Sequence, residues 1–315
     1  MRIICTISLL ESLELLREQI NICKQHKISD VRLNVNKIRH YKDLEKLEET
    51  INYATSNNIK IYLDLPYPFC NPRSILNQKK LHIKQDDMVW IDVRNYDGKS
   101  SYKYSIDNVL DYFSVGKDYF FSDGKGCMRF IGVDNDFLRF KALNSFELYH
   151  MKAVSADKKV KTELSPELYK IINSSKPYAL MFSFVSDTDF LYEIKKKITY
   201  DFLPVFKIED QYGIDNMENI CKINCEIVIA RGDLALETNF KNLLVNQKYI
   251  SQIAKKNGRT VIVATDVFWS MSKRYIPSRA DVIDFEIIRE TGADIILNAD
   301  IISSSRFDYV MELLK

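Results

Sequence analysis

The chain has 315 residues, 46% of them hydrophobic, which suffices for one large core or for a core with a smaller second domain. Its 45 basic and 43 acidic residues are interspersed and give a net charge of +2, which argues against a nucleic-acid polymer or an anionic membrane as a partner. The six cysteines form no CxxC pair and no apolar run reaches membrane-spanning length, so we expect a soluble protein of the reducing cytoplasm.

A short β-rich apolar run followed by an amphipathic helical stretch recurs along the chain. The predicted strands cover 2–7, 30–35, 60–65, 179–185, 203–209, 226–231, 260–266 and 294–299. The predicted helices between them include 12–26, 41–56, 187–197, 240–256 and 278–291. Eight strands that alternate with helices predict an α/β protein with a (β/α)8 barrel.

This alternation is interrupted once, between 71 and 162. Five of the nine glycines fall in this interval, together with many aromatic residues and turn pairs. Such a composition is typical of a small antiparallel β domain. We therefore expect a barrel catalytic domain over 1–71 and 163–315 and an inserted small β lid domain over 72–162.

One stretch, 206–237, carries most of the candidate chemistry. Lys207 and Glu209 stand at the end of one predicted strand, and Asp233 follows the end of the next. Charged side chains in buried parallel strands are costly unless they are paired or bind a metal, and residues two apart share one face of a strand. Cys221 and Cys225, four residues apart, are predicted to share a packed helix face instead.

Two carboxylates from neighbouring strands offer the hard oxygen ligands that Mg²⁺ or Mn²⁺ prefers. Lys207 would then supply positive charge where a phosphoryl group or an enolate carries negative charge. Gly232, in the segment ARGD, lets the backbone approach a ligand closely. The alternative is a structural ion pair between Lys207 and Glu209 at an exposed strand edge, and the charges alone leave both interpretations open.

Two sequence blocks, KIEDQYGIDN and IVIARGDLALE, contain these residues. Other blocks in the chain are RIICTI, VRLNVN, YLDLP, GKDYFFSDGKG, VIVATD and PSRADVIDFEIIRETGADIIL. In order and register they resemble blocks of the pyruvate kinase family, whose versions of the first two read KIEN-x-x-G-x-x-N and MVARGDLG-x-E. The resemblance covers nearly the whole chain and implies a TIM barrel with a small β-barrel lid domain inserted after the third strand.

The resemblance also implies catalytic roles for the matching residues. Glu209 and Asp233 would bind the divalent metal, and Lys207 would stabilise the phosphoryl group during transfer. Thr265 would lie beside the reactive carbon of the substrate. The backbone amides of Gly232 and Asp233 would hold a keto-acid carboxylate.

Sites for a nucleotide and a monovalent cation follow from the same resemblance. Arg32 would contact the transferring phosphate, and with Arg73 and Asp123 it would contribute to nucleotide binding. A K⁺ site would be formed by Asn34, Asn36, Asp64 and the carbonyl of Leu65. Asn36 replaces a serine of the family, but its amide oxygen is also able to coordinate K⁺.

The sequence departs from the family pattern in the residues implied in proton delivery. Asp266 replaces the glutamine that follows the key threonine, and the segment 298–301 replaces SGET. The carboxyl of Asp266 could itself act as an acid or base. The sequence stops at Lys315, so we expect no C-terminal regulatory domain, and we expect a homodimer or another partner to close the barrel beside the last helix.

Three functions are compatible with these features. The first is a phosphotransferase of pyruvate kinase type, which acts on phosphoenolpyruvate and pyruvate, or a related enol or keto acid, and a nucleotide. The second is a metal-dependent aldolase or lyase that stabilises a pyruvate enolate, with Asp266 as a new base. The third is a degenerate, non-catalytic sensor of a keto acid or nucleotide. We favour the first. The retained charges argue against the third, because an unused buried Lys, Glu and Asp would be costly.

Overall fold

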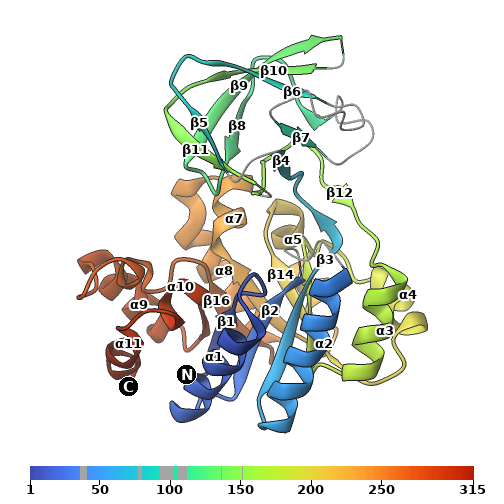
Figure 1. Cartoon of the computed structure of the whole chain (residues 1–315), viewed down its shortest axis with the longest axis vertical. Coiled ribbons are helices and arrows are strands. Elements are labelled where there is room, and N and C mark those ends of the chain that lie inside the picture. Colours follow the sequence, from blue (N-terminus) through green and yellow to red (C-terminus); the bar gives the residue numbers. More distant parts are fainter. Residues whose placement is uncertain (36–40, 77–79, 93–101, 105–111, 136, 151) are drawn as a thin grey trace. The chain divides into compact units, whose positions relative to one another are not determined.

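The computed structural model describes residues 1–35, 41–76, 80–92, 102–104, 112–135, 137–150 and 152–315 (Figure 1). The chain divides into two compact units. The first contains Met1–Pro68 and Glu163–Lys315, and the second contains Phe69–Thr162. The second unit is therefore an insertion within the sequence of the first.

The first unit is built around eight parallel strands. They are β1 (Ile3–Ile7), β2 (Asp30–Asn34), β3 (Lys60–Cys70), β13 (Ala179–Ser183), β14 (Leu203–Ile208), β15 (Glu226–Ala230), β16 (Thr260–Ala264) and β17 (Asp294–Leu297). Neighbours pair in the order β3, β13, β14, β15, β16, β17, β1 and β2, and β2 pairs again with β3. The sheet thus closes on itself, and the predicted α/β barrel is confirmed.

Helices lie on the outside of these strands (Figure 1). They are α1 (Leu13–Gln25), α2 (Tyr41–Ser56), α3 (Pro166–Ser175), α4 (Phe190–Lys197), α5 (Gln211–Asp215), α6 (Met217–Ile220), α7 (Arg231–Glu237), α8 (Leu243–Lys256), α9 (Arg279–Glu290), α10 (Ala299–Ile302) and α11 (Phe307–Leu313), with the 3-10 turns η3 (Phe240–Asn242) and η4 (Trp269–Ser272). Serine N-caps at Ser12, Ser165 and Ser278 start three of them. Among the helices that the structure describes, none combines the length and the apolar character needed to cross a bilayer.

Two local predictions differ from the structure. The third strand extends beyond 65 to Cys70, because β12 (Val160–Lys161) pairs with its last residues and gives them backbone partners. The expectation that Cys221 and Cys225 share a helix face is wrong. Helix α6 ends at Ile220, and Cys225 directly precedes β15, so a turn separates the two buried thiols.

The barrel interior is layered along its axis because alternate residues of each strand point inward. The middle of the interior is an apolar cluster that contains Ile4, Tyr62, Ala179, Met181, Val205, Val228, Ala230, Ile262 and Ile296. Two residues further along three of these strands come Thr6, Asp64 and Lys207. Two residues earlier, at the amino ends, come Arg2, Glu226 and Asp294. Polar residues therefore lie at both ends of this apolar cluster.

The described residues of the second unit form mainly β-strands. A six-stranded sheet has the order β4 (Ser74–Leu76), β7 (Tyr102–Tyr104), β6 (Met88–Asp92), β10 (Phe137–Ala142), β9 (Gly126–Asp134) and β8 (Asp118–Phe121), and β11 (Phe146–Tyr149) pairs with β5 (Lys80–Ile83). Its core is rich in aromatic rings, among them the buried Phe121, Phe130 and Phe140. This unit follows the third barrel strand.

Candidate active site

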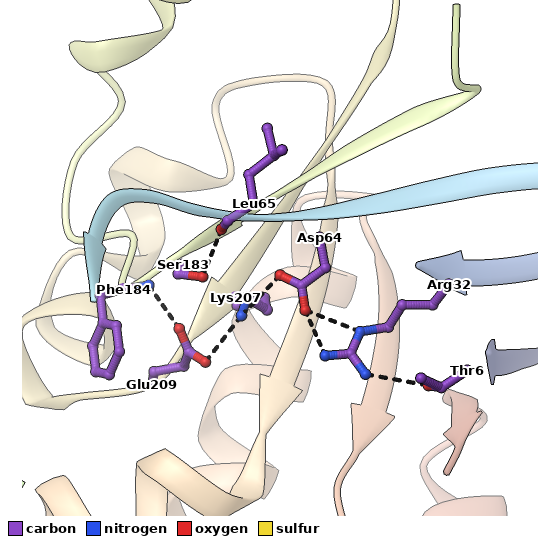
Figure 2. A network of polar contacts seen from close by, with 8 residues as sticks. All are labelled: Thr6, Arg32, Asp64, Leu65, Ser183, Phe184, Lys207 and Glu209. Carbon is purple, nitrogen blue, oxygen red and sulfur yellow. Dashed lines mark hydrogen bonds and ion pairs between the residues drawn. The ribbon is translucent and has the colours of Figure 1, made fainter. Parts of the chain in front are cut away.

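Lys207 is the centre of a buried charge cluster at the carboxyl ends of the barrel strands (Figure 2). It lies near the end of β14 and is 8% exposed. Its Nζ is 3.1 Å from Asp64 Oδ1 and 3.3 Å from Glu209 Oε1. Asp64, from β3, is fully buried, and Glu209, directly after β14, is 3% exposed. The cluster is therefore inside the protein, which excludes an ion pair on an exposed strand edge.

Arg32 enlarges the cluster from strand β2. Its Nε and Nη2 both donate to Oδ2 of Asp64, at 3.0 and 2.5 Å, and its Nη1 donates to the hydroxyl of Thr6 at 3.2 Å. The side chain of Arg32 is 19% exposed, so part of it remains accessible to a ligand. The guanidinium thus joins β1, β2 and β3 and places a second cation beside the lysine.

A backbone amide orients the carboxylate of Glu209. The N–H of Phe184 donates to Oε2 of Glu209 at 2.7 Å, which leaves Oε1 facing Lys207 (Figure 2). Phe184 has the left-handed φ of 49°, and the preceding Ser183 donates its hydroxyl to the carbonyl of Leu65 at 2.8 Å. The backbone directly after β13 therefore directs the Phe184 amide at Glu209.

The cluster shifts the pKa of Asp64, Lys207 and Glu209. Burial alone would raise the pKa of Asp64, but the charges of Lys207 and Arg32 hold it below its usual value. Burial alone would lower the pKa of Lys207, but Asp64 and Glu209 raise it. Burial raises the pKa of Glu209 to about 7, with Lys207 opposing and Asp233 adding to the rise. Glu209 is thus the member whose charge changes near neutral pH.

Asp233 is the second carboxylate of the expected metal site. It lies in the first turn of α7, is half-buried, and its negative charge helps to raise the pKa of Glu209. Two carboxylates that repel each other are stabilised by a divalent cation, and their hard oxygens suit Mg²⁺ or Mn²⁺. In the described ranges, no three or more His, Cys, Asp and Glu side chains converge in a way that could hold a metal. The two carboxylates fit a cation that takes its other ligands from water and substrate.

Thr265 follows β16 and lies against Gly232. A Cβ atom built on Gly232 would be 3.0 Å from Cγ2 and 3.4 Å from Oγ1 of Thr265, so glycine permits this close approach. The carbonyl of Thr265 accepts hydrogen bonds from the buried Arg231. The structure therefore brings Thr265 against Gly232, which directly precedes Asp233 in the chain.

The predicted monovalent-cation residues are partly brought together. Asp64 contacts both cations of the cluster, and the adjacent Leu65 carbonyl accepts the Ser183 hydroxyl. Asn34 ends β2 next to Asp64 in the register of the sheet. Asn36 lies outside the described residues. The assignment of this set to K⁺ stays a prediction.

The two remaining nucleotide-binding candidates lie in the second unit. Arg73 forms an isolated β-bridge with Ala153. Asp123, with a left-handed φ of 60°, accepts a hydrogen bond from the ammonium group of Lys152. Their role in nucleotide binding stays a prediction.

Sequence reasoning missed several residues that shape the site. Thr6, Ser183 and Arg231 hold site residues through hydrogen bonds. A charged Arg231 at the end of an apolar run was a usable signal, because a buried guanidinium needs partners. Asp266, the altered residue after Thr265, has its side chain exposed and a left-handed φ of 58°.

Comparison with known proteins agrees with this architecture. The family described as pyruvate kinase, barrel domain, matches residues 1–304. The pyruvate kinase of Borreliella burgdorferi is 26% identical over 295 residues, which are 87% of this chain and 60% of the relative. Pyruvate kinase 1 of Saccharomyces cerevisiae is 29% identical over 201 residues, 60% of this chain and 40% of the relative. Plastidial pyruvate kinase 2 of Arabidopsis thaliana is 26% identical over 268 residues, 82% of this chain and 46% of the relative.

The chain thus spans 60% or less of the length of these relatives. The family match extends over both units of the chain and includes every described residue of the Lys207 cluster. A closed barrel with a buried Lys–Glu–Asp–Arg cluster at the carboxyl ends of its strands is consistent with that match. This protein belongs to the pyruvate kinase family.

Proposed function

We propose that the protein transfers a phosphoryl group between phosphoenolpyruvate, or a related enol acid, and a nucleoside diphosphate, with Mg²⁺ or Mn²⁺. The observation that supports this most strongly is the buried ammonium of Lys207 between Asp64 and Glu209, in a barrel of this family. A buried cation costs several kcal/mol to desolvate, so its retention at the strand ends argues for use in charge stabilisation.

The charge of the site suits an anionic substrate once a metal is bound. Arg32 and Lys207 carry two positive charges, and the ionised Asp64, Glu209 and Asp233 carry three negative charges. A divalent cation held by Glu209 and Asp233 makes the total positive. Phosphate and carboxylate groups would then be attracted to the site, where Lewis-acid stabilisation of their oxygens would come from the cation held by Glu209 and Asp233.

The residues of the chain have separate roles in the proposed transfer. The bond between phosphorus and the enol oxygen breaks while an oxygen of the nucleoside diphosphate bonds to phosphorus. Arg32 and Lys207 stabilise the negative charge on the phosphoryl oxygens. The enolate that remains takes a proton from solvent water at its methylene carbon, next to Thr265, and becomes the keto acid. The amides of Gly232 and Asp233 hold the substrate carboxylate, and Arg73 and Asp123 serve the nucleotide.

The test is formation of pyruvate from phosphoenolpyruvate, ADP, Mg²⁺ and K⁺ by the purified chain. Lys207→Met should lower the rate about 10²–10³-fold, the cost typical of losing one donor that stabilises developing charge. The matched control is Lys256→Met, because Lys256 is 68% exposed and pairs with Glu218 on the surface. Turnover that is absent, or that Lys207→Met leaves unchanged, would contradict the proposal.

The same samples test the alternative functions. Exchange of pyruvate methyl protons for deuterium without nucleotide would support a lyase or aldolase instead. Binding of pyruvate or nucleotide without either reaction would support a sensor. The three relatives described above are all named pyruvate kinases, so they give these alternatives no separate support.

A further inference from the structure

The guanidinium of Arg231 joins three parts of the barrel unit. Arg231 is the first residue of α7, directly after β15, and is 8% exposed. Its Nε and Nη2 donate to one acceptor, the carbonyl of Thr265, at 3.1 and 2.6 Å. Its Nη1 donates to Oδ1 of Asp284, on α9, at 2.5 Å. The end of β15, the end of β16 and helix α9 thus meet at one side chain.

The carbonyl that Arg231 holds belongs to a strained residue. Thr265 has a φ of 76° and Asp266 a φ of 58°. A left-handed conformation is unfavourable for a β-branched residue. Such a conformation persists only where surrounding contacts enforce it. The paired hydrogen bonds from Arg231 are contacts of that kind, because they fix the direction of the peptide group that follows Thr265.

This conformation determines where the Thr265 side chain lies. Its Cγ2 and Oγ1 are packed against Gly232, as the 3.0 and 3.4 Å distances from a Cβ built on Gly232 show. The Cβ and the carbonyl carbon of Thr265 turn together about its N–Cα bond, so a change of φ would move both the carbonyl that Arg231 holds and the side chain that packs against Gly232. By holding the carbonyl of Thr265, Arg231 therefore also orients the hydroxyl of Thr265.

The other partner of Arg231 is also fixed in place. Helix α9 starts with a capping box, in which the Ser278 hydroxyl accepts from the Asp281 N–H at 3.0 Å and Asp281 accepts from the Ser278 N–H. Asp281 also accepts a hydrogen bond from the Ser270 hydroxyl, which lies in η4. Asp284 therefore extends from a helix whose start is anchored to the segment after β16.

We propose that Arg231 is a positioning residue for catalysis: with Asp284 behind it, it holds Thr265 in the orientation that protonation of the enolate requires. This inference rests on the proposed function, because it assigns Thr265 to the substrate's reactive carbon. It differs from a structural ion pair between Arg231 and Asp284, which would affect stability and leave the reaction unchanged.

The test combines kinetics with a spectroscopic measurement on the full chain. Arg231→Lys keeps the positive charge but loses the paired donors, and Asp284→Asn weakens the support behind them. The matched control is Arg259→Lys, because Arg259 also donates its Nε to a carbonyl, that of Cys221, at 2.9 Å, before β16 begins. Methyl-labelled threonine, assigned with Thr265→Ser, reports the conformation of Thr265 by NMR without any turnover.

We expect Arg231→Lys and Asp284→Asn to shift the Thr265 methyl resonance, and Arg259→Lys to leave it in place. Arg231→Lys should lower kcat about 100-fold, the effect of a misplacement of about 1 Å, with KM for phosphoenolpyruvate nearly unchanged. An unmoved resonance in a folded Arg231→Lys variant, or a raised KM with normal kcat, would overturn the inference.

The outcomes for the two proposals are distinguishable. If the wild-type chain has no turnover, the proposed function fails, and the methyl resonance still decides whether Arg231 sets the conformation of Thr265. If Arg231→Lys does not fold, Asp284→Asn carries the test, because Asp284 is one-third exposed and its asparagine is nearly isosteric.

Discussion

Replacement of Lys207 by methionine should destabilise the barrel unit in a way that depends on pH. The change keeps a long apolar side chain but removes the ammonium that lies 3.1 Å from Asp64 and 3.3 Å from Glu209. Asp64 retains its hydrogen bonds from Arg32. Glu209 retains the Phe184 amide but loses its cation. The main energetic consequence therefore falls on Glu209.

The magnitude follows from the distances and the burial. With an effective dielectric constant of about 20, a charge pair at 3.3 Å is worth about 5 kcal/mol. Removing the lysine also removes the cost of burying it, and loss of one partner of a buried pair typically destabilises by about 3–5 kcal/mol. Glu209 is able to take up a proton in the variant, which limits the loss. We therefore expect Lys207→Met to lower the free energy of unfolding by about 3 kcal/mol at pH 8, the low end of this range.

The sign of the pH dependence follows from the raised pKa of Glu209. This pKa is about 7 in the folded wild type, above the ordinary value of 4.5, so folded-state stability falls as pH rises between those values. Without Lys207 the pKa rises further and this loss continues above pH 7. Between pH 6 and pH 8 the deficit of the variant should therefore widen by about 1.4 kcal/mol.

The assay is urea unfolding in EDTA at both pH values, with Trp90→Phe as the background. The remaining tryptophan, Trp269, lies in the barrel unit, so its fluorescence reports on the unit that contains the substitution. Lys256→Met is the surface control and should cost less than about 1 kcal/mol. A deficit for Lys207→Met that stays constant or narrows from pH 6 to pH 8 would show that Lys207 does not stabilise the charged form of Glu209.

Three further outcomes are expected. Mn²⁺ affinity, measured by electron paramagnetic resonance, should rise about tenfold per pH unit below pH 7 and level off above it, because the metal displaces a proton from Glu209. An affinity that does not change with pH would show that Mn²⁺ binding does not displace this proton. Arg2→Met should lower the free energy of unfolding in urea by about 3 kcal/mol, because Arg2 lies 2.9 Å from Glu226 and 3.0 Å from Asp294 and is only 26% exposed. A loss no larger than that of the surface variant Arg17→Met would show that Glu226 and Asp294 do not need the charge of Arg2. Gly232→Ala should lower the free energy of unfolding by about 1–3 kcal/mol, because the new Cβ would crowd the Thr265 side chain. An unchanged free energy of unfolding would mean that the segments around Gly232 and Thr265 move apart at little cost.

The fold and the centre of the site were predictable from local patterns. The apolar runs and the helical stretches between them are strong periodic signals, and eight such units leave few architectures. Lys207 and Glu209 were recognisable because two charges at the end of a buried strand need partners. The sequence alone could not supply Asp64 as the shared partner without the family resemblance, because 143 positions separate it from Lys207.

The features that escaped prediction depend on long-range contacts or on backbone conformation. Strand β3 extends to Cys70 because of a two-residue partner strand that is too short to show periodicity. The left-handed conformation of Thr265 is unfavourable for its residue type and becomes understandable only with the Arg231 side chain in place. The pairing of Arg231 with Asp284, 53 positions away, leaves no local sequence signal.

The most direct test of the central claim is to locate the divalent metal. Crystals soaked with Mn²⁺ and oxalate, a mimic of the pyruvate enolate, would be measured for the anomalous scattering of manganese. We expect one manganese bound by the carboxylates of Glu209 and Asp233, with oxalate as a further ligand near Lys207. Manganese bound elsewhere, or oxalate bound away from these two carboxylates, would contradict it.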